Sequence, residues 1–208
     1  MANIIDKGQV TLQGGAIMSW NITDDEVLTI SGDLWHGPVT VGKDIKSEAK
    51  FRHLVLDESV QAIGIFNFSD WDCLEEVTLP PSIKYIEHAA FGGCKNLKRV
   101  NLPDGLEIIG ADSFCGCESL ETIILPATLK EIYECAFYET GIAEISVPWK
   151  EPICIENGCF PEDTVVYIPK EAHRAYLKAS GWQDYTLKTI TVHQHTDSQM
   201  PYGTEDQA

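Results

Sequence analysis

Apolar positions recur along most of the chain at a step of 23 residues. A column of phenylalanines sets the step, at Phe68, Phe91, Phe114, Phe137 and Phe160. Three further apolar columns keep this step to within one residue: Leu54, Val77, Val100, Ile123 and Ile145; Leu56, Leu79, Leu102, Leu125 and Val147; Ile63, Ile86, Ile109 and Ile132. One such unit cannot bury its apolar side alone, so the pattern predicts a solenoid of stacked coils with one continuous core.

Each unit predicts a short strand followed by a turn onto the opposite side of the coil. In the unit that begins at Leu74, Val77 and Leu79 alternate with the polar Thr78, as in a half-buried strand. Pro80 has no N–H to donate, so the strand ends there. The next inward positions, up to Phe91, predict a second short strand or a helical turn. Equivalent strands of successive coils are then expected to stack in parallel, with one sheet strand per coil.

The repeat divides the chain into four expected parts. Residues 1–50 form an N-terminal cap, residues 51–168 a solenoid of about five coils, residues 169–192 a C-terminal cap, and residues 193–208 a mobile tail. Caps are required because a terminal coil exposes its apolar face. The stretch from Lys170 to Ser180 predicts a helix that covers the last coil. Trp149 is either an exposed aromatic anchor for a partner or, as the favoured interpretation, a plug against this cap.

The units resemble the BspA-type leucine-rich repeat family. The resemblance lies in "LEEVTLPPSIKYIEHAAFGGCKN" from Leu74 and "LKRVNLPDGLEIIGADSFCGCES" from Leu97. It implies a β-rich α/β fold, a right-handed leucine-rich repeat solenoid, with a role in protein–protein recognition or adhesion, often at bacterial surfaces. One coil departs from the pattern, because Thr140 and Gly141 replace its usual ending and the step there falls to 22 residues.

Charge narrows the choice of partners. The chain has 15 Lys and Arg against 32 Asp and Glu, a formal net charge of −17. This disfavours nucleic acid and anionic lipid, which both need a basic face, and favours a basic protein or polymer partner. No apolar run is long enough to cross a membrane. The first 20 residues lack a signal-peptide pattern, which predicts a cytoplasmic location, whereas the resemblance favours the cell surface. The protein is expected to be a monomer.

The outward positions of the predicted strands are the candidate binding site. They form two ladders on one exposed face: His53, Glu76, Arg99, Thr122 and Glu144, and beside them Thr78, Asn101, Ile124 and Ser146. One interpretation is a face that recognises a protein or an extended polymer without catalysis. The other is a set of solvated strand residues, in which Glu76 and Arg99 form an ordinary surface ion pair. Both interpretations stay open at this point.

Two alternatives come from other classes of protein. Cys94, Cys115 and Cys117 could supply sulfur ligands to a metal or a reactive thiol. Because the chain has no C-x-x-C pair, and free cysteine is among the most buried residue types, a place in the core is the favoured interpretation. No catalytic arrangement and no cofactor are predicted. The remaining alternative is a structural spacer with no partner.

Overall fold

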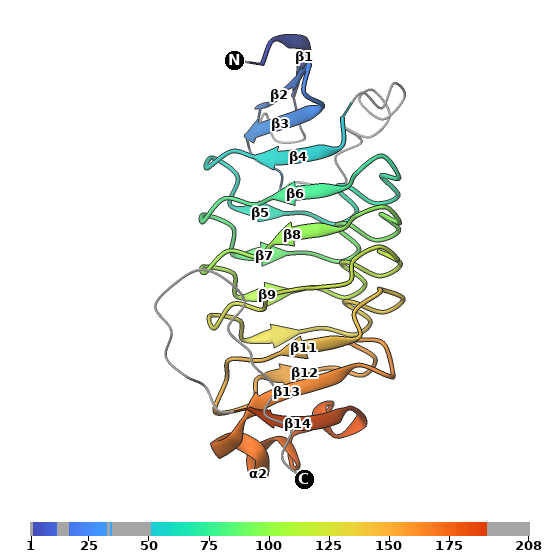
Figure 1. Ribbon diagram of the computed structural model, residues 1–208. Coiled ribbons are helices and arrows are strands. Elements are labelled where there is room, and N and C mark those ends of the chain that lie inside the picture. The colour runs from blue at the N-terminus through green and yellow to red at the C-terminus, as the bar shows by residue number, and fades with distance from the viewer. Residues whose placement is uncertain (1, 12–16, 33, 35–50, 191–208) are drawn as a thin grey trace.

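The computed structural model describes residues 2–11, 17–32, 34 and 51–190 (Figure 1). These residues form an elongated stack of coils, with a strand-built cap at the N-terminal end and a helix-containing cap at the other (Figure 1). The predicted mobile tail, residues 193–208, lies outside the described residues, as does most of the segment between the N-terminal cap and the first coil.

The front of the stack carries the predicted parallel strands. A six-stranded sheet has the order β1-β2-β3-β4-β6-β8, and a three-stranded sheet has the order β11-β13-β14. The parallel members of the first sheet are β3 (Val27–Gly32), β4 (His53–Leu56), β6 (Glu76–Thr78) and β8 (Arg99–Asn101). Their register places residues that are 23 apart side by side, as for Val77 and Val100. The repeat columns of the sequence are therefore columns in space.

A second sheet forms the rear of the stack. Its order is β12-β10-β9-β7-β5, and each strand has two residues: Ala62–Ile63, Tyr85–Ile86, Ile108–Ile109, Glu131–Ile132 and Cys154–Ile155 for β5, β7, β9, β10 and β12. All its pairings are parallel. The sequence left a short strand or a helical turn open here, and the structure has the strand, followed by turns.

The core is a continuous column between the two sheets. The phenylalanine rings from Phe68 to Phe160 stack face to face, with centroids 5.2–5.3 Å apart. All five of these side chains are at most 1% exposed. Since one coil covers the next, no coil has a core of its own.

The coil that begins at Leu120 differs from the expectation of a strand in every coil. Residues 121–125 belong to neither front sheet, although Ile123 still points inward and is 7% exposed. The rear sheet continues past this coil through β9, β10 and β12. The interruption falls where the repeat step shortens to 22 residues, after Leu120.

The N-terminal cap is an antiparallel extension of the front sheet. Strands β1 (Ile4–Thr11) and β2 (Ile17–Thr23) pair with each other, and β2 pairs with β3. Gly8 lies opposite Trp20, and a β-carbon on Gly8 would come within 2.6 Å of the indole ring. The sequence predicted β3 as part of this cap, but not the β1–β2 hairpin.

The C-terminal cap covers the last coil with aromatic side chains. After β13 (Val165–Pro169) come a 3-10 turn (Lys170–Ala172), the short helix α2 (His173–Tyr176), a second 3-10 turn (Trp182–Asp184) and β14 (Thr186–Ile190). The helix is therefore much shorter than predicted, although Ala172 and Tyr176 are buried as expected. Trp149 lies against Trp182, with ring centroids 6.3 Å apart, which confirms its interpretation as a plug.

Candidate functional site: the strand face

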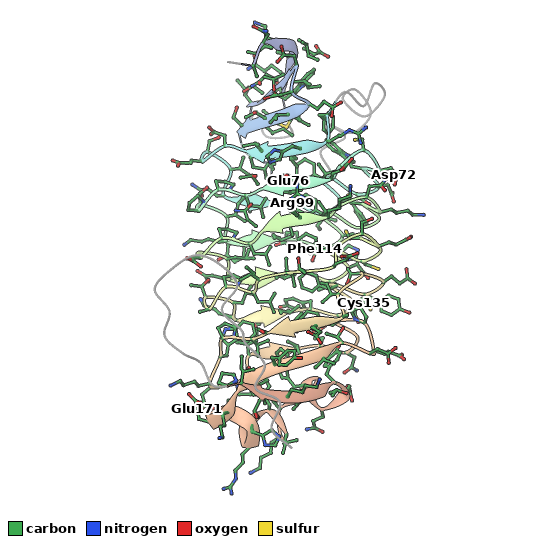
Figure 2. The ribbon with its side chains drawn as sticks, in the orientation of Figure 1. Asp72, Glu76, Arg99, Phe114, Cys135 and Glu171 are labelled. Atoms are coloured by element: carbon green, nitrogen blue, oxygen red, sulfur yellow. The ribbon has the colours of Figure 1, made fainter. Side chains whose placement is uncertain are left out.

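The strand face consists of the outward side chains of β4, β6, β8, β11 (Glu144–Ser146) and β13, together with those of residues 121–125 (Figures 1 and 2). Pairing places His53 beside Glu76, Glu76 beside Arg99, and Thr78 beside Asn101. The two predicted ladders therefore exist from β4 to β8. In the second sheet, the register pairs Glu144 with Val165 and Ser146 with Tyr167.

In the N-terminal half of the face, the charged side chains bind one another. The Arg99 guanidinium donates to the Glu76 carboxylate at 2.6 Å. This hydrogen bond holds the pKa of Glu76 below its ordinary value. The His53 Nε2 and Thr78 Oγ1 atoms lie 2.8 Å apart, which links β4 to β6.

Asn101 is held by the backbone of the preceding coil. Its side-chain oxygen accepts from the Leu79 N–H at 2.8 Å, and its amide nitrogen donates to the Leu79 carbonyl at 3.0 Å. Both polar atoms of the side chain are thereby used. Asn101 thus contributes to the stacking of the coils, at a point where the strand β6 has just ended and the backbone needs new partners.

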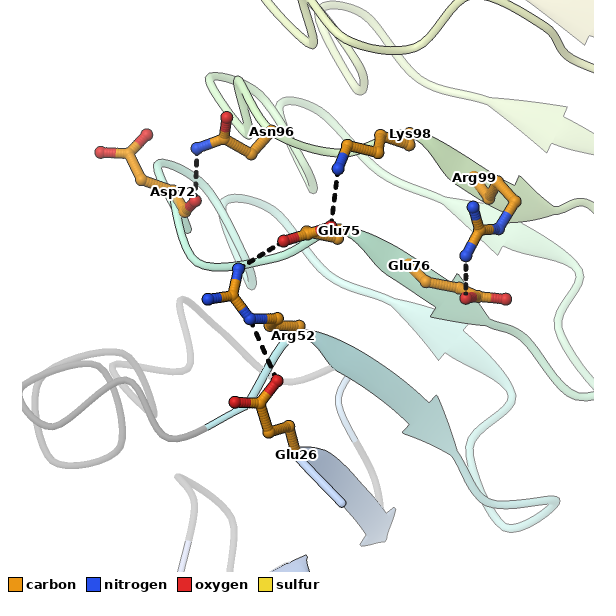
Figure 3. A network of polar contacts seen from close by, with 8 residues as sticks. All are labelled: Glu26, Arg52, Asp72, Glu75, Glu76, Asn96, Lys98 and Arg99. Atoms are coloured by element: carbon orange, nitrogen blue, oxygen red, sulfur yellow. Dashed lines mark hydrogen bonds and ion pairs between the residues drawn. The ribbon is translucent and has the colours of Figure 1, made fainter. Parts of the chain in front are cut away.

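A network of ion pairs borders this half of the face (Figure 3). The Glu75 carboxylate accepts from Lys98 at 2.7 Å and also from Arg52, which reaches Glu26 at 3.0 Å. The two hydrogen bonds, that from Lys98 first, lower the pKa of Glu75. Three successive coils and the N-terminal cap are connected in this way.

The C-terminal half of the face has a different character. Ile124 is 80% exposed, the largest exposed fraction among the large hydrophobic side chains that the structure describes. Thr122 and Glu144 are exposed beside it, and Ser146 is half-buried. The Tyr167 hydroxyl donates to Glu144 at 3.3 Å, and the Lys188 ammonium lies 5.7 Å from the centre of the Tyr167 ring.

Two of the three candidate cysteines lie in the core, and the third is half-buried. Cys94 and Cys117 are fully buried and donate to the carbonyls of Phe68 and Phe91, at 3.1 and 3.3 Å. Burial raises the pKa of Cys117 far above its ordinary value, and burial also raises that of the half-buried Cys115. Both shifts oppose formation of the thiolate, which is the nucleophile and the metal ligand.

The arrangement of the described residues also bears on metal binding and on membrane insertion. Within these ranges, no three His, Cys, Asp or Glu side chains come together as a possible metal site, so the predicted alternative at Cys94, Cys115 and Cys117 is wrong for a three-sulfur site. Across the same part of the chain, no helix has the length and apolar character needed to cross a membrane.

Sequence reasoning missed several polar residues that shape the face. Arg52, Glu75 and Lys98 are 23 residues apart and precede the strand positions, so the same column counting could have found their network. Tyr167 and Lys188 continue the column of Thr78 and Asn101 beyond the solenoid. They were missed because the regular step of the repeat ends before Tyr167.

The stacked coils and the face of parallel strands define a leucine-rich repeat solenoid. Residues 40–171, more than half of the chain, match the model of the BspA-type leucine-rich repeat region, in six copies. The chain therefore belongs to the BspA-type leucine-rich repeat family. No curated protein is detectably similar in sequence.

Solved structures share this fold at low sequence identity. A leucine-rich repeat protein from Eubacterium ventriosum is 17% identical with a TM-score of 0.59, over 80% of this chain and 45% of that protein. A leucine-rich repeat protein from T. pallidum is 22% identical with a TM-score of 0.53, over 81% of this chain and 77% of that protein. This chain thus spans less than half of the Eubacterium protein. The likeness concerns the fold alone.

Proposed function

We propose that the protein is a non-enzymatic recognition module that binds another protein through its strand face. The observation that carries the proposal is the register of the stack. It sets outward side chains of successive coils beside one another on one exposed face, including Glu76 next to Arg99 and Thr78 next to Asn101. Solenoids commonly use such extended faces to bind partners.

The overall charge favours a basic partner. A formal charge of −17 creates an attractive field for cationic surfaces and a repulsive one for nucleic acid and anionic lipid. The pairs on the N-terminal half of the face are already formed, so their side chains are held in place before binding. Side chains that are fixed in advance lose less conformational entropy when a partner docks.

The test is an affinity capture with a charge-swapped face. The double variant Glu76→Lys, Arg99→Glu exchanges the two ends of one ion pair, so the pair is kept while its orientation on the face is reversed. Wild type and variant are immobilised and exposed to extracts of the source cells and of their surroundings. We expect a partner that the wild type holds and the variant loses, with equal melting temperatures for the two proteins.

A matched control lies on the rear of the stack. Glu107 and Lys130 form an ion pair at 2.5 Å, next to β9 and β10 of the rear sheet. The double variant Glu107→Lys, Lys130→Glu should keep the partner. If the rear variant loses it and the face variant keeps it, the binding site lies on the rear sheet and the proposal is overturned.

A bacterial cell surface is part of the proposal, through the family. Members of the family are expected to act in recognition or adhesion there, and the cytoplasm is the alternative location. Labelling of intact and permeabilised source cells with an antibody distinguishes the two. Signal from intact cells supports the surface, and signal only after permeabilisation supports the cytoplasm.

A further inference from the structure

The two halves of the strand face differ in how many of their polar groups already have partners. In the N-terminal half, Glu76 pairs with Arg99, His53 contacts Thr78, and Asn101 is bound to the backbone of Leu79. These contacts hold the side chains in place, but they leave a partner few polar groups with which to form new hydrogen bonds. Replacing such a surface pair by a contact to the partner brings no net gain in hydrogen bonds.

The C-terminal half has carboxylates that no cation of the described residues neutralises, although Glu144 accepts a hydrogen bond from Tyr167 at 3.3 Å. Glu121 and Glu144 are exposed carboxylates, and neither forms an ion pair with any residue in the described ranges. Glu121 occupies the column of Arg52, Glu75 and Lys98, but Lys98 is engaged by Glu75. Two negative charges thus flank Thr122 without a cation of their own.

Ile124 lies on the same face, in the column next to that of Thr122 and Glu144. Its side chain is 80% exposed, while Ile123 before it and Leu125 after it are 7% and 3% exposed. Alternation therefore directs Ile124 outward, in the column of Asn101 and Ser146. A partner that covers this exposed aliphatic side chain removes apolar surface from water, which stabilises the complex.

We propose that Ile124, Thr122, Glu121 and Glu144 form the docking centre of the strand face, for a protein segment that combines an apolar side chain with Lys or Arg. We refer to these four residues as the Ile124 patch. The apolar side chain covers Ile124, and the cation pairs with the carboxylates of Glu121 and Glu144, which form no ion pair with the described residues. This inference rests on the proposed function, because it names the place and the partner chemistry of the same face.

The local backbone also distinguishes this patch. Residues 121–125 belong to neither front sheet, whereas the flanking strands β8 and β11 are paired. Side chains on a segment without ladder hydrogen bonds can shift to fit a partner at lower cost than those on a paired strand. The most exposed apolar side chain therefore lies on the most adaptable part of the face.

The experiment uses a displayed library of random linear 12-residue peptides, selected on the full-length wild type. We expect enriched sequences in which Lys or Arg lies within a few residues of an aliphatic or aromatic side chain. The best peptide is then synthesised, and its Kd is measured by fluorescence anisotropy. Ile124→Ala and Glu144→Lys should each weaken binding about tenfold or more, the usual effect of removing a binding hot spot.

The control is the rear variant Glu107→Lys, Lys130→Glu, which reverses an ion pair of the same kind away from the strand face. It should bind the peptide within about twofold of the wild type, and all variants should keep the wild-type melting temperature, because Ile124 and Glu144 are exposed. Affinity should also fall with added salt, since the carboxylates contribute through charge.

Each contrary result has a distinct meaning. If the peptide is lost by the face variant Glu76→Lys, Arg99→Glu and kept by Ile124→Ala, the face still binds but the Ile124 patch is not its centre. If neither variant affects binding, both the patch and the strand face are overturned. A library that yields no enriched peptide, or peptides without the basic and apolar pattern, overturns the partner chemistry, and the proposed function is then judged by the affinity capture alone.

Discussion

The hydroxyl of Ser113 lies in the middle of the core without a hydrogen-bond partner among the described residues. The same repeat position in the adjacent coils holds Ala90 and Ala136, which are also buried. A buried polar group that makes no hydrogen bond costs about 1–3 kcal/mol. We therefore expect Ser113→Ala to raise the free energy of unfolding by about 1 kcal/mol, measured as a higher urea midpoint with an unchanged slope.

Thr164 is the matched control for Ser113. Its buried hydroxyl donates to the Ile142 carbonyl at 3.0 Å, so Thr164→Val removes a hydrogen bond while it keeps the volume of the side chain. This variant should be destabilised by about 1 kcal/mol. A destabilised Ser113→Ala variant would show that the serine hydroxyl has a partner after all.

Two repeat positions in each coil require a left-handed backbone. One column contains Phe66, Ala89, Asp112, Cys135 and Gly158, with φ between 49° and 68°, and the other contains Asp70, Gly93, Gly116 and Glu139, with φ between 56° and 76°. Glycine adopts this conformation without strain, whereas an L-residue loses roughly 1–2 kcal/mol. The turn of each coil is thus imposed by the stack, even on residues that disfavour it.

Gly116 and Glu139 test this strain at equivalent positions of neighbouring coils. A β-carbon on Gly116 would lie 3.6 Å from its nearest neighbour, so Gly116→Ala adds backbone strain without a clash and should cost about 1 kcal/mol. Glu139→Gly should act in the opposite direction, by up to about 1 kcal/mol. The measurement is chemical unfolding of both variants. Equal and unchanged midpoints would mean that the turns relax at no cost.

At the scale of elements, the interrupted front sheet sets the local stability. The amides of residues 121–125 make no backbone hydrogen bond to the described residues of adjacent coils, whereas those of β8 and β11 belong to paired strands. Hydrogen exchange at 121–125 should therefore be much faster than in β8, β11 or the rear strand β10 of the same coil. Equal protection throughout would show that the front sheet is continuous in solution.

The ion pairs between coils give the stack a pH dependence that centres on Glu75. Its pKa is lowered by Lys98 and Arg52, so the pairs add stability above the ordinary Glu pKa of about 4.5, and this contribution is lost as the pH falls through the lower folded pKa. Glu75→Gln should melt at a lower temperature than wild type near pH 6–7. The difference should shrink as the pH falls below the ordinary Glu pKa and disappear once the wild-type carboxyl is protonated.

Glu121 provides the comparison for Glu75, because it occupies the same column without an ion pair to a described residue. Glu121→Gln should change the melting temperature little at any pH. A Glu75→Gln variant that tracks the wild type over the whole pH range would show that this network contributes nothing to folding.

The repeat predicted the elements well because each inward column is a single physical requirement. The step of 23 residues identifies the residues that lie beside Phe91 and Val77 in the stack, because a stack of coils buries equivalent positions together. The predicted face from His53 to Asn101 follows from the same counting. The pattern of apolar and polar positions does not specify whether these residues bind a partner.

Other features could not be predicted from the sequence pattern because they depend on contacts outside the repeat. Hairpin β1–β2 has no repeat column, and its pairing is set by close fits such as Gly8 on Trp20. The two backbone hydrogen bonds of Asn101 depend on the end of strand β6. The interruption at residues 121–125 was marked in the sequence only by a step one residue short. None of these follows from an alternation of apolar and polar positions.

At the scale of the whole molecule, the two ends decide whether the stack holds. Each coil contacts only its neighbours, so the free energy of the solenoid is close to a sum of coil and interface contributions. Trp182 is fully buried over the last coil, 5.2 Å from Tyr176 and 6.4 Å from Phe160 between ring centroids, and its indole N–H donates to the Ile153 carbonyl at 2.9 Å. It is the centre of the C-terminal cap.

Trp182→Ala should therefore destabilise the end of the stack before its middle. The expected cost is about 3–5 kcal/mol, as for other buried aromatic residues. Because the loss reaches the last coil first, hydrogen exchange should increase most in β11, β13 and β14, and least in β4 and β6. Leu177→Ala, in the same cap but at a residue 55% exposed, should leave exchange unchanged. An equal loss of protection in all coils would instead mean that the interfaces between coils are so strong that the solenoid unfolds as one unit. No coil could then open alone, and the amides of residues 121–125 would have to exchange at the rate of global unfolding.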